Sequence, residues 1–255
     1  MARYPHLHDS WRAEEAIARI HGWDFSHIDG RHIEENDLPW DYRTEILARL
    51  TPEMRILDLD TGGGEFLRSL GHPPTQTAAT EGYPPNIALC ERELLSLGID
   101  FRPADVKGKL PFGDGEFDLI LNRHGDLNPA EIARLLRPGG RFITQQVGAD
   151  NDRALVKLLL GDTPTPFPDQ HLTIAADRFK AAGLTIEAAA EHFGTIRFFD
   201  VGALVWFARI IEWEFPGFSV DTCLDALECA QALIERNGEI SAQTHRFFLV
   251  ARRPG

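Results

Sequence analysis

Cysteine is scarce in this chain of 255 residues, which contains only Cys90, Cys223 and Cys229. The number is odd, and no two of them have the spacing Cys-x-x-Cys. A disulfide framework and a cysteine-based zinc site therefore both lack their usual pattern. We expect reduced thiols that lie mostly in the core.

Long apolar stretches are also missing. No run approaches the roughly 20 residues that a bilayer-spanning helix needs. Residues 1–6 lack the apolar core of a secretion signal. The sequence thus predicts a cytoplasmic protein without membrane contact.

Basic residues are also few. The chain has 26 Lys and Arg residues and 39 Asp and Glu residues, which gives a formal net charge of −13. Nucleic-acid binding draws much of its affinity from basic side chains that neutralise phosphates. The only dense basic stretches, at Arg246 and at Arg252 and Arg253, are short and are interpreted as a solvated strand end. A nucleic-acid substrate is therefore disfavoured, and a small molecule is the expected partner.

A glycine-rich turn is the most informative feature that the chain does have. The apolar run 54–59 leads into three glycines at 62–64 and then into a helix. Glycine tolerates positive φ and lets a ligand approach the backbone closely. Glu81 ends the next strand, 75–80, at a spacing where a carboxylate can accept from two ribose hydroxyls. Together the turn and the acid predict a nucleoside site.

The dinucleotide fingerprint would need a third glycine at position 67 for close helix–strand packing. Position 67 is Leu. A bound pyrophosphate is therefore disfavoured, and a nucleoside cofactor of another kind is favoured.

The chain resembles the class I S-adenosylmethionine-dependent methyltransferases, in particular small-molecule enzymes of the type 11 or type 25 group. Five segments resemble that family's motifs in the family's order: 56–64, 81–83, 104–106, 110–120 and 135–143. The resemblance is close over residues 50–150 and loose elsewhere, so it informs the cofactor more than the substrate.

The resemblance implies a role for each site residue. The methionine part would lie on Asp60, Thr61, Gly62, Gly63 and Gly64, the ribose on Glu81 and Gly82, the adenine beside Tyr83, Asp105 and Val106, and the α-amino group near Asn122. Asp58 would support the loop, and Tyr42, like Trp40, would either line the cofactor site from the lid or pack in the core.

Asp60 departs from the family's pattern, which has glycine there. Its carboxylate would lie near a ligand that carries a carboxylate of its own, and like charges in a partly dry site repel. Three interpretations stay open. Asp60 binds the α-ammonium, it turns outward with little effect, or it marks altered or lost cofactor use.

Methyl transfer is an in-line displacement, so the protein mainly aligns a nucleophile, and a base is optional. His124 follows Asn122 and is the candidate base or orienter, against the alternative of a structural loop residue. The segment 122–126 lacks the Asn/Asp-Pro-Pro-aromatic signature of many enzymes that methylate bases or amides. Asp126 with Asp150 or Asp152 is a thin basis for a metal site, and we predict no metal.

The middle of the chain alternates strands and helices, which predicts an α/β fold with helices on both faces of a parallel sheet. We expect a Rossmann-like, mostly parallel sheet of seven strands, completed by strands 184–192 and 242–252, the latter antiparallel. We expect one structural domain with three parts. These are a helical lid over 1–50 (helices 10–20, capped by Ser10, and 42–50), a core over 51–150, and a completion over 151–255.

A largely helical, aromatic insertion at about 198–237 precedes the last strand and is the expected seat of substrate specificity. Its Trp206 and Trp213, with Glu212 and Glu214, would form either a pocket for an aromatic or cationic molecule or simple core.

The leading hypothesis is an enzyme that transfers a methyl group from S-adenosylmethionine to oxygen or nitrogen of a small molecule. One alternative is an RNA or protein methyltransferase, which would need a local basic groove. Another is a non-catalytic regulator that binds S-adenosylmethionine.

Overall fold

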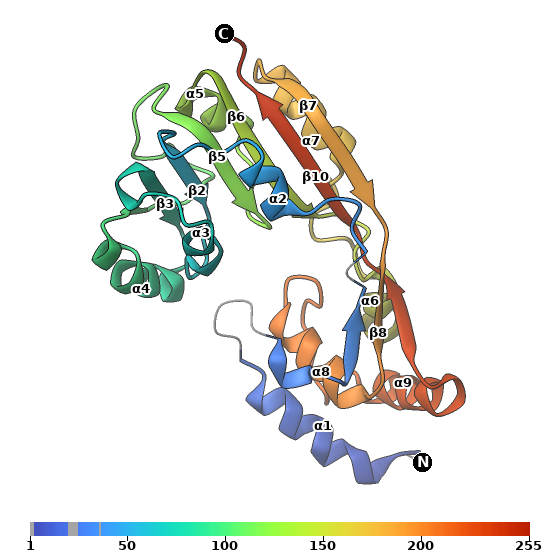
Figure 1. Ribbon diagram of the computed structural model, residues 1–255. Helices are drawn as coiled ribbons and strands as arrows, with labels where there is room; N and C mark the ends of the chain where they lie inside the picture. Colours follow the sequence, from blue (N-terminus) through green and yellow to red (C-terminus); the bar gives the residue numbers. More distant parts are fainter. Residues whose placement is uncertain (1–2, 20–24, 36) are drawn as a thin grey trace. The chain divides into compact units, whose positions relative to one another are not determined.

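The computed structural model describes residues 3–19, 25–35 and 37–255, which form two compact units (Figure 1). The sheet unit comprises Leu38–Gly148, Asp169–His192 and Arg246–Gly255. The helical unit comprises Met1–Asp37, Ala149–Pro168 and Phe193–His245. The expected lid over 1–50 is thus divided, because residues 38–50 belong to the sheet unit.

The sheet unit contains a seven-stranded sheet of order β4-β3-β2-β5-β6-β10-β7. Neighbours from β4 to β6 pair in parallel, and β10 runs antiparallel to both β6 and β7. The expected fold, a mostly parallel sheet with an antiparallel last strand, is confirmed. The strands are β2 (Ile56–Leu59), β3 (Thr77–Glu81), β4 (Asp100–Pro103), β5 (Phe117–Arg123), β6 (Leu136–Val147), β7 (Thr185–His192) and β10 (Arg246–Arg252).

Alternation along the strands produces two apolar faces, because successive side chains in a strand point to opposite sides. Ile56 and Leu119 belong to one core, which also holds buried side chains of α2, α3 and α4. Leu57 and Ile120 belong to the other, together with side chains of α5 and α7. The helices are α2 (Tyr42–Leu47), α3 (Glu65–Ser69), α4 (Pro84–Glu93), α5 (Pro129–Leu135) and α7 (Leu172–Ala181).

The strand order reverses beside β2, whose neighbours are β3 on one side and β5 on the other. In open parallel sheets, ligands bind outside the carboxyl ends of the strands at such a reversal. The glycine turn follows β2, Glu81 ends β3, and Asn122 lies near the end of β5. The fold therefore brings the three predicted motifs to one edge.

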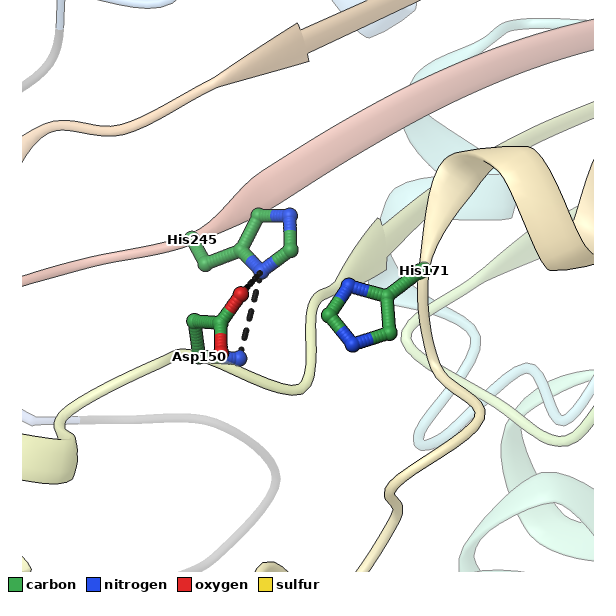
Figure 2. Close-up of side chains that lie close together, drawn as sticks. All are labelled: Asp150, His171 and His245. Atoms are coloured by element: carbon green, nitrogen blue, oxygen red, sulfur yellow. Dashed lines mark hydrogen bonds and ion pairs between the residues drawn. The ribbon is translucent and has the colours of Figure 1, made fainter.

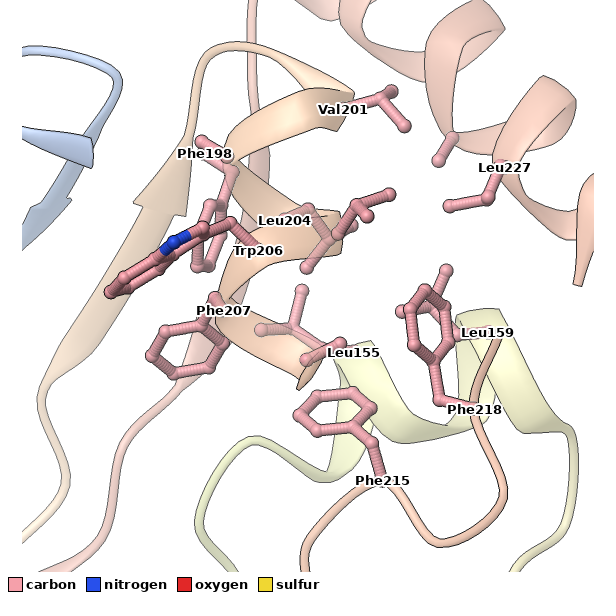
Figure 3. Packing of buried hydrophobic residues seen from close by; sticks show 14 of the residues in the cluster. Leu155, Leu159, Phe198, Val201, Leu204, Trp206, Phe207, Phe215, Phe218 and Leu227 are labelled. Carbon is pink, nitrogen blue, oxygen red and sulfur yellow. The ribbon is translucent and has the colours of Figure 1, made fainter. Parts of the chain in front are cut away.

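The helical unit has its own antiparallel sheet, of order β1-β8-β9. Its core surrounds α8, which is apolar on all sides and hence central (Figure 3). Trp206 is 2% exposed within this core and is therefore a packing residue, whereas Trp213 is 41% exposed. The elements are α1 (Pro5–Ile17), β1 (His32–Glu34), α6 (Arg153–Leu160), β8 (Thr195–Phe198), α8 (Val201–Ile210), α9 (Leu224–Asn237) and β9 (Ile240–Gln243).

The expected strand 242–252 is wrong in its first part. The chain forms β9 and then β10, with Thr244 and His245 between them, and each strand pairs in a different sheet. The backbone N–H of Thr244 bonds to the carbonyl of Gly194, outside either ladder. Periodicity within one segment does not reveal this change of partner, and β1 and β8 were missed for the same reason.

The first helix begins earlier than predicted, at Pro5 with Tyr4 as N-cap, and not at Ser10. Proline suits the first helical position because its φ is already helical and its missing N–H is not needed there. Ser10 lies inside the helix, and its hydroxyl bonds to the carbonyl of Leu7. The helix ends at Ile17 with Ala18 as C-cap, before the predicted end at Ile20, a residue that lies outside the described ones. In the described part of the chain, no helix has the length and apolarity to cross a membrane.

Candidate functional site

The carboxylate of Glu81 joins the ends of β2 and β3. Its Oε2 accepts from the backbone N–H of Gly62 at 2.8 Å, and its Oε1 accepts from those of Gly82 at 2.9 Å and Tyr83 at 2.8 Å. Three charge-assisted bonds to a carboxylate that is 5% exposed make this a rigid connection. A carboxylate offers about four lone-pair sites. One site on Oε2 is thus left for a ligand hydroxyl.

Gly64 ends the turn in a left-handed conformation, with φ at +79°, and is the N-cap of α3. A Cβ atom here would lie 2.6 Å from Cδ2 of Leu94, which is fully buried. The carbonyl of Gly62, earlier in the turn, accepts a bond from the thiol of Cys90 at 2.9 Å. The turn is therefore packed tightly against α4.

Asp60 also adopts a left-handed conformation, with φ at +52°. Aspartate visits this region more readily than most residues, although glycine suits it better. Its carboxylate is directed at the loop after β5, where it accepts from the backbone N–H of Asp126 and lies so near Gly125 that a Cβ there would be 2.6 Å from Oδ2. Asp60 therefore connects the turn after β2 with the loop after β5.

The acids at this edge repel one another. Burial, together with the charges of Glu81, Asp126 and Asp105, raises the pKa of Asp60 to about 7. Burial, together with Glu81, also raises the pKa of Asp58 to about 7, against the lowering effects of its bond from Thr61 and of Arg123. Asp58 and Asp60 are therefore partly protonated near pH 7, and a cation bound beside them would favour their ionised forms.

The raised pKa of Asp60 predicts that Asp60→Asn stabilises the fold more at pH 8 than at pH 5. The pKa of Asp60 is raised, so its protonated form favours the folded state at low pH, and that contribution is lost as pH rises through about 7. Asparagine keeps the left-handed conformation and the acceptor oxygen without the charge. We expect the gain in unfolding free energy to increase by about 1–2 kcal/mol between the two pH values.

Chemical denaturation of both proteins at each pH measures this gain. Asp177→Asn, at an exposed position on α7, is the matched control and should give the same difference at both pH values. A gain for Asp60→Asn that does not grow with pH would show that the carboxyl group ionises freely.

Asn122 sits at the centre of a buried polar network. Its Nδ2 donates to the carbonyl of Leu59 at 3.2 Å, and its Oδ1 accepts from Nε2 of Gln146 at 2.6 Å. The hydroxyl of Tyr42 donates to the carbonyl of Asn122 at 3.1 Å. Tyr42 is 6% exposed, so α2 is anchored at the end of β5.

Asp105, Val106 and Tyr83 lie at the ends of β3 and β4. Asp105 Oδ1 accepts from the backbone N–H of Lys107 at 2.9 Å, and Val106 is buried. A Cβ at Gly82 would lie 3.3 Å from the carbonyl of Ala104, so glycine brings these two segments close. Tyr83 is 62% exposed and is free to lie against a ligand.

His124, like Asp60, is a non-glycine residue with a left-handed backbone, with φ at +62°. Its backbone N–H donates to the carbonyl of Gln145 at 2.9 Å, and its Nε2 lies 3.3 Å from Nε2 of Gln145. Although the ring keeps contact with solvent, desolvation and the charges of Arg246 and Arg123 lower the pKa of His124. The imidazole is therefore neutral near pH 7.

The acidic residues that were considered as metal ligands belong to two different units of the structure. Asp126 belongs to the sheet unit and forms an ion pair with Lys107 at 2.9 Å, whereas Asp150 and Asp152 belong to the helical unit. Figure 2 shows Asp150 beside His245, whose Nδ1 accepts from the backbone N–H of Asp150 at 3.2 Å. The absence of a metal remains a prediction.

The helical unit contains a hollow of about 320 Å³ beside α1 and the start of α8. Arg31 is one of the residues that line this hollow. Its guanidinium donates to the carboxylate of Asp200 at 2.7 and 2.8 Å and forms an ion pair with Glu14 at 2.8 Å. These carboxylates satisfy the guanidinium, so the cluster is best understood as a structural connection between segments.

Sequence reasoning missed Gln145 and Gln146, whose side chains hold His124 and Asn122. A signal was available, because two adjacent amides interrupt the apolar run of β6. Their partners are distant in the chain, however, and no motif identifies them.

Solved structures share this fold. A putative methyltransferase from Bacillus halodurans superposes with a TM-score of 0.57 at 17% identity over 84% of this chain and 97% of its own. A functionally unknown protein from Deinococcus radiodurans has a TM-score of 0.59 at 18% identity over 97% of this chain and 99% of its own. These likenesses concern the fold, a Rossmann-like α/β fold with a mostly parallel seven-stranded sheet.

Residues 57–144 match the family model described as a methyltransferase domain. Demethylmenaquinone methyltransferase of Thermus thermophilus is 33% identical over 117 residues, 42% of this chain and 53% of that protein. Phthiotriol/phenolphthiotriol dimycocerosates methyltransferase of Mycobacterium tuberculosis is 33% identical over 110 residues, 40% of each chain. The chain spans about half or less of the length of these relatives. The glycine turn, Glu81 and Asn122 all lie within the segment 57–144 that matches a methyltransferase domain.

Proposed function

We propose that this chain transfers a methyl group from S-adenosylmethionine to oxygen or nitrogen of a small molecule. The observation that carries the proposal is the convergence of Asp58, Asp60 and Glu81 on the glycine turn, where burial and mutual repulsion raise the pKa of the first two to about 7. S-adenosylmethionine brings a sulfonium and an ammonium, whereas a dinucleotide brings two phosphates. Such a site attracts the former and repels the latter.

The residues fit that cofactor group by group. Oε2 of Glu81 has one acceptor site for a ribose hydroxyl, and the exposed ring of Tyr83 and the buried Val106 suit the two sides of a purine. The carboxylate of Asp60, at the loop after β5, would stabilise the ammonium group. The bound cofactor supplies an electrophilic methyl group, and the chain's own residues position the acceptor and exclude water.

Support for a small-molecule acceptor comes from two sides. The names of the two relatives refer to demethylmenaquinone and to phthiotriol dimycocerosates, which are small molecules or lipids and not nucleic acids. The net charge of −13 also opposes a polyanionic substrate. A cytoplasmic location belongs to the same proposal.

Calorimetric titration with S-adenosylmethionine should give micromolar binding that strengthens about tenfold from pH 6 to pH 7.5. A cation beside Asp60 and Asp58 stabilises their ionised forms, so binding releases protons while these groups are still protonated, below about pH 7. Titrations in two buffers of different ionisation enthalpy measure the released protons directly.

S-adenosylhomocysteine is the matched control ligand, because it lacks the sulfonium and should show a weaker pH dependence. Failure of the folded protein to bind either ligand would contradict the proposal. Binding of both without methyl transfer to any compound in a metabolite mixture would favour the non-catalytic regulator. Salt-sensitive binding of RNA or of a protein would favour the remaining alternative.

A further inference from the structure

A chain of hydrogen bonds fixes which nitrogen of His124 carries the proton. The indole Nε1 of Trp40 donates to Oε1 of Gln145 at 2.8 Å, and Nε2 of the same amide lies 3.3 Å from Nε2 of His124. An indole N–H can only donate, so it must face the amide oxygen, and the amide NH₂ must face the imidazole. Nε2 of His124 is therefore the acceptor, and the neutral ring has its proton on Nδ1.

The surroundings hold this arrangement in place. Trp40 is 9% exposed and stacks on Phe248 with ring centroids 5.9 Å apart. The backbone of His124 is held by its bond to the carbonyl of Gln145 at 2.9 Å. The lone pair of Nε2 is thus engaged, and the group that His124 offers to a ligand is a hydrogen-bond donor, Nδ1–H.

Two basic side chains lie near His124, although the chain as a whole is acidic. Arg246 and Arg123 are the charged groups that act on the imidazole. The guanidinium of Arg123 lies over the ring of Phe66, 4.8 Å from its centroid. Among the described residues no carboxylate pairs with Arg123, although Arg134, for example, pairs with both Asp114 and Glu131.

We propose that the methyl acceptor binds as an oxyanion, a carboxylate, enolate or phenolate, whose charged oxygen accepts from Nδ1–H of His124 and faces the guanidinium of Arg123. This inference rests on the proposed function and narrows it from oxygen or nitrogen to an acidic oxygen. A cationic amine would meet the guanidinium of Arg123 and a hydrogen-bond donor, so its binding is opposed.

The chemistry balances without a base. The oxyanion's electron pair forms the new O–C bond with the methyl group, the C–S bond breaks with its electron pair left on sulfur, and no proton moves. An acceptor that is already ionised needs only orientation and charge stabilisation. His124 would then be a catalytic residue as a donor and not as a base.

Nitrogen NMR of the histidine rings in the full chain tests the first step. We expect His124 at pH 7 to be neutral with the proton on Nδ1, and His124→Gln identifies its signals. Trp40→Phe removes the indole donor, frees the Gln145 amide to turn, and should shift the proton partly to Nε2 of His124. An Nε2–H tautomer or an imidazolium in the unaltered chain at pH 7 would overturn the inference.

Titration with three matched pairs tests the second step, in protein saturated with S-adenosylhomocysteine. The pairs are benzoate with benzamide, octanoate with octanamide, and 4-nitrophenolate with 4-nitroanisole. We expect at least one anion to shift the Nδ1–H signal of His124 and to bind about tenfold tighter than its neutral partner. No response to any anion at millimolar concentration, or preferred binding of benzylamine, would contradict the proposal that the acceptor binds as an oxyanion.

Arginine variants locate the charge that the anion recognises. Arg123→Gln should weaken binding of the anion about fivefold. Arg137→Gln makes the same change at the start of β6, at the opposite edge of the same sheet, and should have no effect. Equal effects of the two variants would mean that the anion responds only to net charge, against the inference.

Calorimetry with S-adenosylhomocysteine on the same samples separates the two proposals. If S-adenosylhomocysteine binds but the His124 tautomer or the anion titration differs from expectation, only the inference about the acceptor is contradicted. No binding of that ligand removes the proposed function, and the anion titration of the unliganded protein then shows whether the rim at His124 still recognises oxyanions.

Discussion

Glu81→Gln should weaken the binding of S-adenosylmethionine about 100-fold or more. The carboxylate accepts from three backbone N–H groups, of Gly62, Gly82 and Tyr83. In glutamine, one end of the side chain becomes an NH₂ donor that must face N–H donors, so at least one bond becomes a repulsion. Hydrogen bonds to charged groups contribute about 1.5–3 kcal/mol each. The turn and the site for the ribose hydroxyl are lost together.

Calorimetry at pH 7.5 measures this loss, with far-ultraviolet circular dichroism to confirm that the variant is folded. Glu91→Gln is the matched control, since it removes the same charge from an exposed position of α4. The control should bind as the unaltered chain does. Affinity of Glu81→Gln within threefold of the control would show that the carboxylate has no part in cofactor binding.

Gly64→Ala should lower the unfolding free energy by about 2–5 kcal/mol. Part of the cost arises because alanine is strained at a φ of +79°. The larger part arises because the new Cβ would lie 2.6 Å from Cδ2 of Leu94. Leu94, the C-cap of α4, is fully buried in the core that contains α4, so a shift of its side chain disturbs closely packed neighbours. We expect cofactor binding to fail as well, because the turn must shift.

Gly98→Ala separates the two contributions, because Gly98 has φ at +83° but nothing within 4 Å of its Cβ position. Urea denaturation should give a loss of about 1–2 kcal/mol for this control. In a Leu94→Ala background, the added cost of Gly64→Ala should fall to the same value. Equal costs for Gly64→Ala and Gly98→Ala in the unaltered background would show that Leu94 does not press on the turn.

Much of the arrangement at the carboxyl ends of the strands was predictable from sequence because its determinants are local. The alternation of Ile56, Leu57 and Asp58 identifies a strand with two buried faces, and Gly64 identifies a turn that needs positive φ. The strand order then places Glu81 and Asn122 beside that turn, since carboxyl ends of parallel strands share one edge. Asp60 was recognised as unusual for the same local reason, as a side chain where glycine is expected.

The environment of His124 was not predictable in this way. Trp40 lies 105 positions from Gln145 in sequence, and neither residue belongs to a recognisable motif. The position of the proton on Nδ1 of His124 depends on the orientation of the Gln145 amide. That orientation depends on the indole of Trp40, which lies just before α2. Sequence alone left open whether His124 is a base or an orienter.

The sequence by itself determined the sheet, the glycine turn and the acids around it, because strand periodicity and the conformational freedom of glycine act over a few neighbouring residues. Tertiary structure alone decided that three separate segments form the helical unit and that β9 and β10 pair in different sheets. It also decided which donor faces the edge beside His124. These features depend on which distant segments meet, and that depends on packing of the whole chain, which no local pattern encodes.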